Sequence, residues 1–248
     1  MLRTTTFGAG DVPVLLFNDW FGDHRTYDPA RPYLDTARFR WVFCDLRGYG
    51  LNREVPGEHT LEEAAADMVA VLESLGGAHL VGHSMSSLVA QQVAVDRPDL
   101  VRSLVLVCPV PPQGMGAPEP VIAWLEGVAR DVGSREAALG ARMAARYGLG
   151  WARFKLDRWA DAADPEAVAA YVRTYATRTV NGAAPDGLAV STIVGDRDDE
   201  PFTPATVRAK VGTFWPDVRI EVCESAGHYP MQETPAAFAR LLAEALGR

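Results

Sequence analysis

The chain has few cysteines and no long apolar segment. Its three cysteines, Cys44, Cys108 and Cys223, each lie in a strand-like apolar run, which is typical of reduced residues in a protein core. No Cys or His residues pair at the close spacing of metal ligands, so we expect neither a metal site nor another cofactor. No apolar run approaches the ~20 residues of a membrane-spanning helix, and the N-terminal residues lack the apolar stretch of a signal peptide. We therefore expect a cytoplasmic protein without a membrane partner.

The chain also has fewer basic than acidic residues. The chain of 248 residues carries 24 Lys and Arg against 32 Asp and Glu, which gives a formal net charge of −8. Nucleic acids and anionic membranes are bound through clustered Lys and Arg, so this balance argues against both as partners. With 48% hydrophobic and 23% charged residues, the chain can bury the core of one large domain. We expect a small-molecule partner, and the composition leaves the oligomeric state open.

Short apolar runs alternate with helical patterns along the chain. This alternation is typical of an α/β fold with a mainly parallel, doubly wound sheet and helices on both faces. One covering helix is predicted from the capping box of Thr60 and Glu63 to the stop signal at Gly76, and a last helix is predicted from Thr234 and Pro235 onward. The predicted strands cover residues 12–17, 41–44, 78–81, 103–108, 188–194 and 218–223.

Residues 112–185 break the alternation, because they carry helical patterns and no strand signal. We therefore divide the chain into an α/β core of residues 1–111 and 186–248 and an inserted helical unit of residues 112–185. Three of the six tryptophans lie in this insertion. Their rings either pack the helices together or line a site at the ends of the strands, where parallel sheets bind ligands. The three candidates are Trp124, Trp151 and Trp159.

The segment Gly82-His83-Ser84-Met85-Ser86 follows one predicted strand and precedes a helical pattern. A nucleophile on a sharp strand-to-helix turn needs small flanking residues, because the helix must pass close to the strand. Such a turn would lift Ser84 out of the sheet, and the N–H groups at the start of the helix would point toward the site. Taken alone, the pentapeptide also fits an exposed serine in a turn.

Acidic residues and a histidine follow two later strands. Asp196 and Asp198 come after the strand at 188–194, and His228 comes after the strand at 218–223. A neutral serine hydroxyl needs an imidazole to accept its proton and a carboxylate to orient that imidazole. The chain supplies these three groups at strand ends in the order Ser, Asp, His, which predicts a nucleophilic catalytic site.

With these motifs, the chain resembles the α/β-hydrolase superfamily over essentially its whole length. The resemblance implies that Ser84 is the nucleophile, that His228 is the general base and then the acid, and that Asp198 is the orienting carboxylate. Asp196 is the alternative acid. The motifs that carry the resemblance are residues 82–86, Asp-Leu-Arg-Gly-Tyr-Gly at 45–50, Gly-Asp-Arg-Asp at 195–198, and Gly227-His228 with Pro235 beyond.

The resemblance also implies a lid formed by residues 112–185 and an oxyanion hole formed by two backbone N–H groups. The donors would be those of Met85, after the nucleophile, and Trp20, in the loop after the first predicted strand. Two such donors commonly lower the barrier by several kcal/mol. Dehalogenase and epoxide hydrolase chemistry are disfavoured, because those relatives use Asp where this chain has Ser84.

Two positions depart from the family pattern. Ser86 replaces the usual Gly at the end of the nucleophile turn, and in this the chain is similar to the plant strigolactone and karrikin receptors and their bacterial signalling relatives. Asn18-Asp19 replaces the usual His-Gly before the oxyanion residue. The loop at 19–28 is similar to that of cofactor-free quinolone dioxygenases. Their acid follows an earlier strand, which in this chain leads into residues 108–112 without an acid.

The charge of Asp19 matters because of its expected place beside the oxyanion. A carboxylate about 6 Å from the oxyanion would oppose it by roughly 3 kcal/mol, or about a hundredfold in rate. We therefore expect the carboxylate to turn away, held by backbone donors of its own loop or by a cation such as Arg25 or Arg47. The rival interpretation is that Asp19 faces the cavity, where it binds a substrate hydroxyl or cation, or restrains hydrolysis in a binding protein.

These features together predict a serine hydrolase of the carboxylesterase or lactonase type. It would cleave a small, largely apolar carboxylic ester or lactone through an acyl-enzyme. One alternative is a ligand-binding signalling protein with slow or no turnover, in which a partner protein reads a movement of the lid. Two further candidates are a carbon–carbon bond hydrolase with the same three residues and a cofactor-free dioxygenase.

Overall fold

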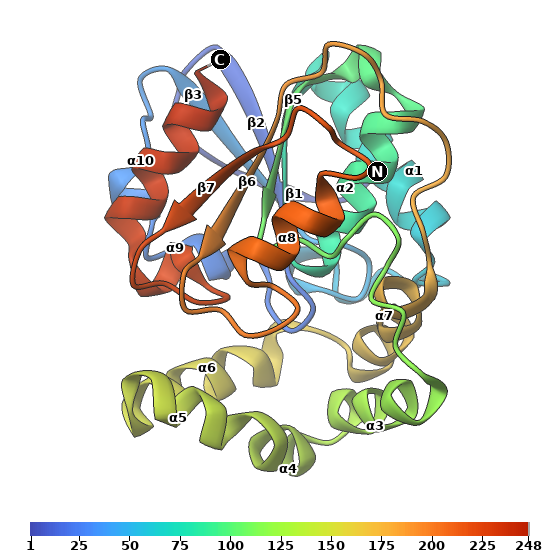
Figure 1. The fold of residues 1–248 in the computed structure, drawn as a ribbon, viewed down its shortest axis with the longest axis vertical. Helices are drawn as coiled ribbons and strands as arrows, with labels where there is room; N and C mark the ends of the chain where they lie inside the picture. Colours follow the sequence, from blue (N-terminus) through green and yellow to red (C-terminus); the bar gives the residue numbers. More distant parts are fainter. Residues whose placement is uncertain (248) are drawn as a thin grey trace.

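A seven-stranded sheet forms the centre of the molecule (Figure 1). This computed structural model describes residues 1–247, apart from the side chains of residues 141, 142 and 144. The strand order is β1-β3-β2-β4-β5-β6-β7; β1 pairs antiparallel with β3, and the other neighbouring pairs are parallel. The mainly parallel α/β fold predicted from the sequence is therefore confirmed. The strands are β1 Thr4–Phe7, β2 Val12–Phe17, β3 Phe39–Cys44, β4 Ala78–His83, β5 Val101–Val107, β6 Val190–Gly195 and β7 Arg219–Cys223.

The strands differ from the predicted ranges mainly at their ends. β2 has the predicted bounds, whereas β3 begins at Phe39 instead of residue 41 and β4 continues to His83 instead of residue 81. β1 lies outside all the predicted ranges. Its residues are exposed or half-buried, because it pairs only with β3 at the edge of the sheet, so it shows no apolar alternation in the sequence.

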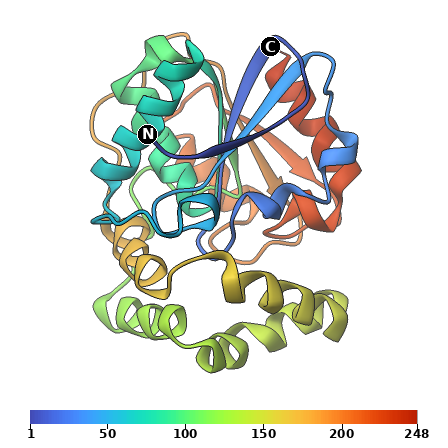
Figure 2. The same cartoon turned by 180° about the vertical axis from the view of Figure 1, so that it is seen from behind.

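Helices cover both faces of the sheet, as the two opposite views show (Figures 1 and 2). α1 (Leu61–Leu75) and α2 (Met85–Asp96) lie on one face, and α10 (Pro235–Leu246) lies on the other. α1 begins as predicted, because the Thr60 hydroxyl accepts the N–H of Glu63 at 3.2 Å. The core also has α8 Pro204–Val211, α9 Pro230–Glu233 and the short 3-10 helices His24–Tyr27, Arg31–Tyr33, Gly50–Asn52 and Pro98–Leu100.

The insertion follows β5 and precedes β6. Within residues 112–185, the described chain forms helices, and its one β-type contact is a single bridge between Ala163 and Tyr49. In Figures 1 and 2 these helices form a layer across the end of the sheet toward which the parallel strands point. They are α3 Glu119–Arg130, α4 Val132–Arg135, a π-helical turn Glu136–Gly140, α5 Ala141–Tyr147, α6 Leu149–Ala162 and α7 Pro165–Thr177.

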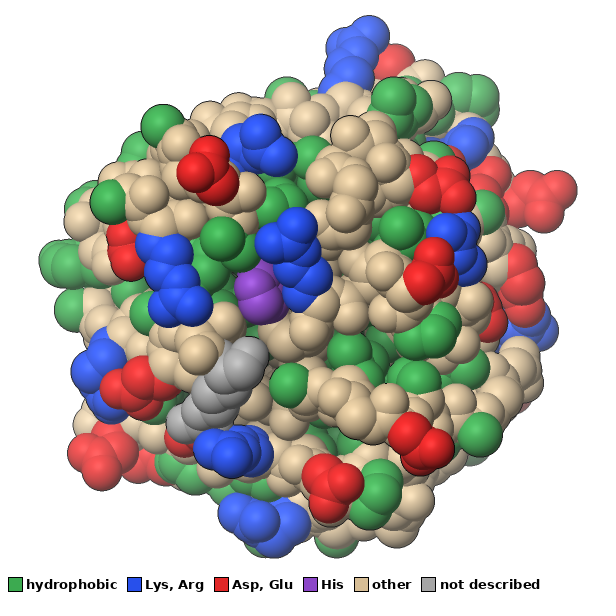
Figure 3. Space-filling model, turned by 90° about the horizontal axis from the view of Figure 1, so that it is seen from above, with side chains coloured by type: hydrophobic (Ala, Val, Ile, Leu, Met, Phe, Trp, Pro, Cys, Tyr) green, Lys and Arg blue, Asp and Glu red, His purple; other side chains and the backbone are tan. Residues whose placement is uncertain are grey.

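The cysteines lie in the interior, and charged side chains of both signs lie on the surface. Cys44, Cys108 and Cys223 are buried and free, as the sequence predicts for core residues, and burial raises the pKa of each thiol. Among residues 1–247, no helix combines the length and the apolar character needed to cross a membrane. At the end of the molecule opposite the insertion, Lys and Arg side chains lie among Asp, Glu and uncharged side chains (Figure 3).

Candidate active site

Ser84 lies at the turn between β4 and α2 with φ of 51° and ψ of −116°. Non-glycine residues seldom adopt a positive φ, and such strained conformations gather at functional sites. The turn also needs Gly82, because a Cβ there would lie 2.6 Å from the Cα of Ser87. Ser86 is fully buried, and its hydroxyl accepts the N–H of His83 at 3.0 Å. The serine that replaces the usual glycine therefore stabilises the turn from inside.

Two further predicted residues meet Ser84 at this turn. Its Oγ lies 2.9 Å from Nε2 of His228, and Nδ1 of His228 lies 2.8 Å from Oδ2 of Asp198. Burial acts to raise the pKa of Asp198, but His228 and the N–H of Asp199 hold it below its usual value, so the carboxylate stays ionised. Asp196 is exposed, and the carboxylate that contacts His228 is that of Asp198. The geometry therefore favours Asp198 over Asp196 as the orienting acid.

His83 and Tyr229 hold the loop of His228, and sequence reasoning missed both. The carbonyl of His228 lies 2.8 Å from Nε2 of His83. Burial lowers the pKa of His83 to about 4, so this ring is neutral and its Nε2–H donates to the carbonyl. The Tyr229 hydroxyl donates to Oδ2 of Asp19 at 2.7 Å. No local signal could identify this bond, because 210 positions separate the two residues.

The loop after β2 is pinned by bonds to its carbonyl groups. The side chain of Asn18 donates to the carbonyl of Asp19 at 2.8 Å and accepts the N–H of Leu46 at 2.9 Å. The Tyr49 hydroxyl donates to the carbonyl of Trp20 at 2.8 Å. In a trans peptide the C=O and the N–H point in opposite directions, so fixing the carbonyl of Asp19 also fixes the N–H of Trp20. Asn18 therefore orients one of the two predicted oxyanion donors.

Both predicted oxyanion donors are available for a ligand. Within the part of the chain that the structure describes, the N–H groups of Trp20 and Met85 have no hydrogen-bond partner. Met85 is the first residue of α2, where the first N–H groups of a helix lack partners and the helix dipole is positive. The two groups can therefore donate to a negative oxygen near Ser84.

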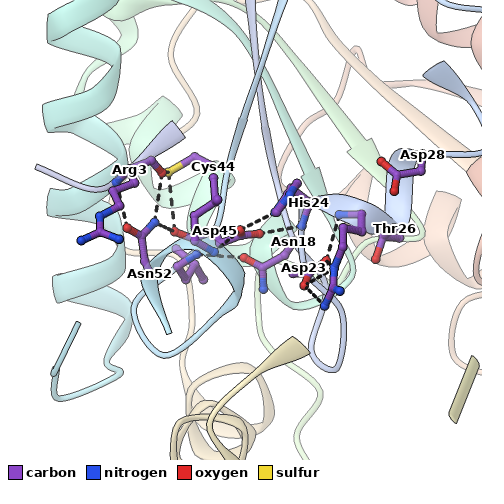
Figure 4. A network of polar contacts seen from close by, with 12 residues as sticks. Arg3, Asn18, Asp23, His24, Thr26, Asp28, Cys44, Asp45 and Asn52 are labelled. Atoms are coloured by element: carbon purple, nitrogen blue, oxygen red, sulfur yellow. Dashed lines mark hydrogen bonds and ion pairs between the residues drawn. The ribbon is translucent and has the colours of Figure 1, made fainter. Parts of the chain in front are cut away.

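A buried polar network behind this loop holds it against the loop after β3 (Figure 4). Asp45 is fully buried, and its carboxylate accepts the N–H of His24 at 2.6 Å and the N–H of Leu51 at 2.9 Å. It also bonds Nδ1 of His24 at 2.7 Å. Burial acts to lower the pKa of His24, but the bond to Asp45 and the negative charges of Asp45 and Asp23 together raise the net pKa. The loops after β2 and β3 are thus bonded to each other behind the oxyanion donors.

Asp19 is buried in the cavity wall, with only 1% of its surface exposed. Its donors are the hydroxyls of Tyr229 at 2.7 Å and Thr26 at 3.3 Å. Burial acts to raise its pKa, but His83, which is charged at the low pH where this carboxyl titrates, the charge of Lys155 and the bond from Tyr229 together bring the pKa below its usual value. Asp19 is therefore an ionised carboxylate with side-chain partners.

The predicted partners of Asp19 are wrong. Arg25 pairs with Asp23 and Asp161, and Arg47 pairs with Asp67, so neither cation reaches Asp19. The cation that offsets its charge is Lys155 of α6, and the donors are two side-chain hydroxyls, that of Thr26 in its own loop and that of Tyr229 in the loop after β7, and not backbone groups. The rival interpretation located the side chain better, since Asp19 does line the cavity.

A cavity of about 420 Å³ lies above Ser84 between the core and the insertion. Its wall includes Ser84, His228 and Asp198, together with Asp19. Aromatic side chains from both the core and the insertion form much of the rest: Trp20, Phe21, Trp151, Trp159, Tyr175, Phe202 and Tyr229. The cavity therefore suits a small ligand with an apolar or aromatic body.

Of the three candidate tryptophans, Trp151 and Trp159 line this cavity and Trp124 does not. Trp124 is 55% exposed on the outside of α3, where Ile122, Val128 and Ala129 are the buried residues. The prediction for Trp124 is therefore wrong. Helical periodicity finds an apolar stripe, but it cannot say which side of that stripe the rest of the fold covers.

One group of side chains has the composition of a metal site. Ligand atoms of Cys108, Asp198 and His228 lie within 4.8 Å of one another. Asp198 and His228 already bond each other, and burial raises the pKa of the Cys108 thiol well above its usual value. A protonated thiol is a poor metal ligand, so this group suits proton transfer between Ser84 and His228, with Asp198 orienting the imidazole, better than it suits a metal.

Comparison with known proteins agrees with the geometry. Residues 14–241 match the model of the alpha/beta hydrolase family, so the chain belongs to the α/β-hydrolase superfamily. It is 38% identical over 117 residues to "Putative carbamate hydrolase RutD" of Caulobacter vibrioides, which is 46% of this chain and 41% of that protein. It is 36% identical over 110 residues to the bifunctional esterase/perhydrolase DCH of Acinetobacter calcoaceticus, which is 43% of this chain and 40% of that protein. The matched region thus spans about two fifths of the length of these curated relatives.

Solved structures extend the likeness to the whole chain. An esterase from Exiguobacterium antarcticum superposes with a TM-score of 0.84 at 18% identity and covers 100% of this chain and 96% of its own. A bromoperoxidase from Bacillus anthracis superposes with a TM-score of 0.80 at 19% identity and covers 99% of this chain and 95% of its own. At these identities the similarity shows a shared fold.

Proposed function

We propose that this chain is a serine hydrolase that cleaves small, largely apolar carboxylic esters or lactones through an acyl-enzyme. One observation carries the proposal. Two consecutive hydrogen bonds, from Ser84 to His228 and from His228 to Asp198, lie in the wall of an aromatic cavity. This is the arrangement that turns a weak hydroxyl nucleophile into a reactive one.

In the proposed reaction, Oγ of Ser84 attacks the carbonyl carbon while Nε2 of His228 accepts the hydroxyl proton. Asp198 stabilises the imidazolium that forms, and the N–H groups of Trp20 and Met85 stabilise the oxyanion. His228 then gives its proton to the leaving oxygen, which leaves an acyl group on Ser84. Water then attacks the acyl-enzyme with His228 as the base, and His228 returns the proton to Oγ of Ser84 as the carboxylic acid product leaves.

The cavity supports the substrate class. A volume of about 420 Å³ is at the small end of ligand sites, and its aromatic wall suits an apolar acyl or alcohol group. In this proposal residues 112–185 act as a lid, because α6 contributes Trp151 and Trp159 to the wall over Ser84. A closed lid would exclude bulk water and strengthen the electrostatic interactions in the site.

The test is incubation with a fluorophosphonate probe, mass spectrometry of the labelled peptide, and a panel of short-chain esters and lactones. We expect the probe to modify Ser84 and the Ser84→Ala variant to lose about 10³-fold or more in kcat with its fold intact. The His228→Ala variant should be comparably inactive, and Asp198→Asn should lose far more activity than Asp196→Asn. Labelling at another residue, or near-normal turnover of Ser84→Ala, would contradict the proposal.

The same assays separate this function from its rivals. A signalling protein would bind a ligand of this size with slow or no turnover, and a carbon–carbon bond hydrolase would act on diketones and leave esters intact. A dioxygenase would consume O₂, although the acid after β6 argues against it. Because one relative is named an esterase/perhydrolase, hydrogen peroxide should be tested beside water as the acceptor of the acyl group.

A further inference from the structure

The end of α5 contacts the catalytic loops directly, through Arg146. Nε of Arg146 lies 2.6 Å from Oε2 of Glu233, and its Nη1 donates to the carbonyl of Arg197 at 2.5 Å. Burial acts to lower the pKa of Arg146, but the bond to Glu233 and its charge raise it overall, so the guanidinium remains a cation. One side chain of the insertion therefore bonds two separate loops of the core.

Glu233 connects Arg146 to the base, His228. Its side chain is 1% exposed, and its two oxygens accept the N–H of Gly227 at 2.7 Å and the N–H of Tyr229 at 3.0 Å. These two residues flank His228 on either side. The orientation of the imidazole therefore depends on where the Glu233 carboxylate lies, and that carboxylate bonds Arg146.

Arg197 connects Arg146 to the acid, because it directly precedes Asp198. We call the loop after β6 that carries Asp198 the acid loop and the loop after β7 that carries His228 the base loop. The N–H of Arg197 donates to the carbonyl of Ala226 at 2.9 Å, so the two loops also bond each other. Arg146 adds a second link between these two loops. Its planar guanidinium has several N–H donors, and these reach both the Glu233 carboxylate and the carbonyl of Arg197.

The guanidinium of Arg146 packs directly against the base loop at Gly227. A Cβ added to Gly227 would lie 2.3 Å from Cζ of Arg146, so the space beside Gly227 is occupied by this side chain. Next to it, the Tyr147 hydroxyl donates to the carbonyl of Ser225 at 2.8 Å. The last two residues of α5 thus dock on the segment that leads to His228.

We propose that Arg146 is a positioning residue that makes the alignment of His228 with Asp198 depend on the docked position of the insertion. When α5 is docked, Arg146 holds the acid loop and the base loop in register. When α5 moves away, Glu233 loses its cation and the carbonyl of Arg197 loses a donor, so the contact between His228 and Asp198 loosens. The kinetic part of this proposal rests on the proposed hydrolase function, whereas the structural part is independent of it.

The insertion offers a matched control. Arg130 of α3 bonds Glu166 at 3.0 Å and Arg173 of α7 bonds Glu119 at 2.7 Å, and all four residues lie within the insertion. The Arg130→Met variant therefore removes a lid ion pair without touching the catalytic loops. The Arg146→Met variant removes the contacts to both loops, and Arg146→Lys keeps the charge without the two-pronged geometry.

The structural measurement is ¹H NMR of the downfield signal from Nδ1–H of His228, assigned by its absence in His228→Gln. The His24 signal, from the bond to Asp45, is an internal reference. We expect the His228 signal to move or broaden in Arg146→Met, to be partly restored in Arg146→Lys, and to be unchanged in Arg130→Met. An unchanged signal in a folded Arg146→Met variant would overturn the proposal whether or not the protein hydrolyses esters. If Arg146→Met fails to fold, Arg146→Lys and Arg146→Gln are measured in the same way.

The kinetic measurement separates positioning from substrate binding. With a small neutral ester, we expect Arg146→Met to lose about tenfold or more in kcat with KM changed by less than about twofold, and to react with the fluorophosphonate more slowly by a similar factor. Arg146 also lines the cavity, so a rise in KM at unchanged kcat would overturn the proposal and make Arg146 a substrate-binding residue. If the wild-type chain neither turns over nor labels, the hydrolase function fails, and the NMR result still decides the role of Arg146.

Discussion

The Asp19→Asn variant tests how this site accommodates a buried negative charge beside its oxyanion donors. The substitution removes the charge with little change of shape, and the Asn oxygen can still accept the Tyr229 hydroxyl that now bonds Asp19 at 2.7 Å. Lys155 lies close enough to lower the pKa of Asp19 by its charge. The effect on rate depends on which charges form in the transition state.

Two charges of opposite sign form there, a negative oxyanion and a positive imidazolium on His228. At about 6 Å and an effective dielectric near 20, Asp19 would destabilise the first by roughly 3 kcal/mol and stabilise the second by a similar amount. If the two distances differ by about 2 Å, the remainder is roughly 1 kcal/mol, or about fivefold in rate. We therefore expect Asp19→Asn to change kcat/KM on a neutral ester by less than about tenfold.

The assay compares kcat/KM of the wild-type chain, Asp19→Asn and the control Asp161→Asn on neutral and cationic esters of equal length. Asp161 is an exposed acid paired with Arg25, so its loss should leave both substrates unaffected. A gain of about a hundredfold in Asp19→Asn would contradict this expectation, because the charge would then oppose the oxyanion without compensation. A comparable loss confined to cationic esters would make Asp19 a specificity residue.

Three further predictions concern the stability of the protein and its activity on esters. Burial lowers the pKa of Lys155 to about 7, so between pH 7 and its usual 10.5 the unfolded chain binds more protons and stability should rise with pH by up to about 5 kcal/mol. Lys155→Met should flatten this rise in urea unfolding at pH 7 and 9.5, and parallel slopes would contradict it. Trp159→Ala should lower the free energy of unfolding by about 3–5 kcal/mol and shift the preferred acyl length of the ester substrate. Trp124→Ala should change neither by much, and equal acyl-length profiles for the two variants would contradict the prediction. Gly82→Ala should lower both thermal stability and kcat, because its Cβ would meet the backbone of Ser87, and a fully active, equally stable variant would show that the turn can shift.

The fold class and the residues that meet at the site follow from local patterns in the sequence. Short apolar runs alternating with helices define a parallel sheet, and parallel strands bring their ends to one edge, so residues after three strands must lie near one another. The turn at Ser84 is equally local, because it depends on small neighbours within a few positions. For these reasons the sequence alone identifies Ser84, Asp198 and His228, and the structure places them within hydrogen-bond distance.

The side chains that surround those residues depend on how distant segments pack together. The shorter hydrogen bond to Asp19 comes from Tyr229, the cation near it is Lys155, and the His228 loop is supported by Arg146, each on a different segment of the chain. Trp124 shows the same limit, since a periodic apolar stripe does not say which part of it the fold covers. Periodicity and turn chemistry act over a few residues, whereas a side-chain hydrogen bond depends on atoms placed to within a few tenths of an ångström by packing across the whole domain.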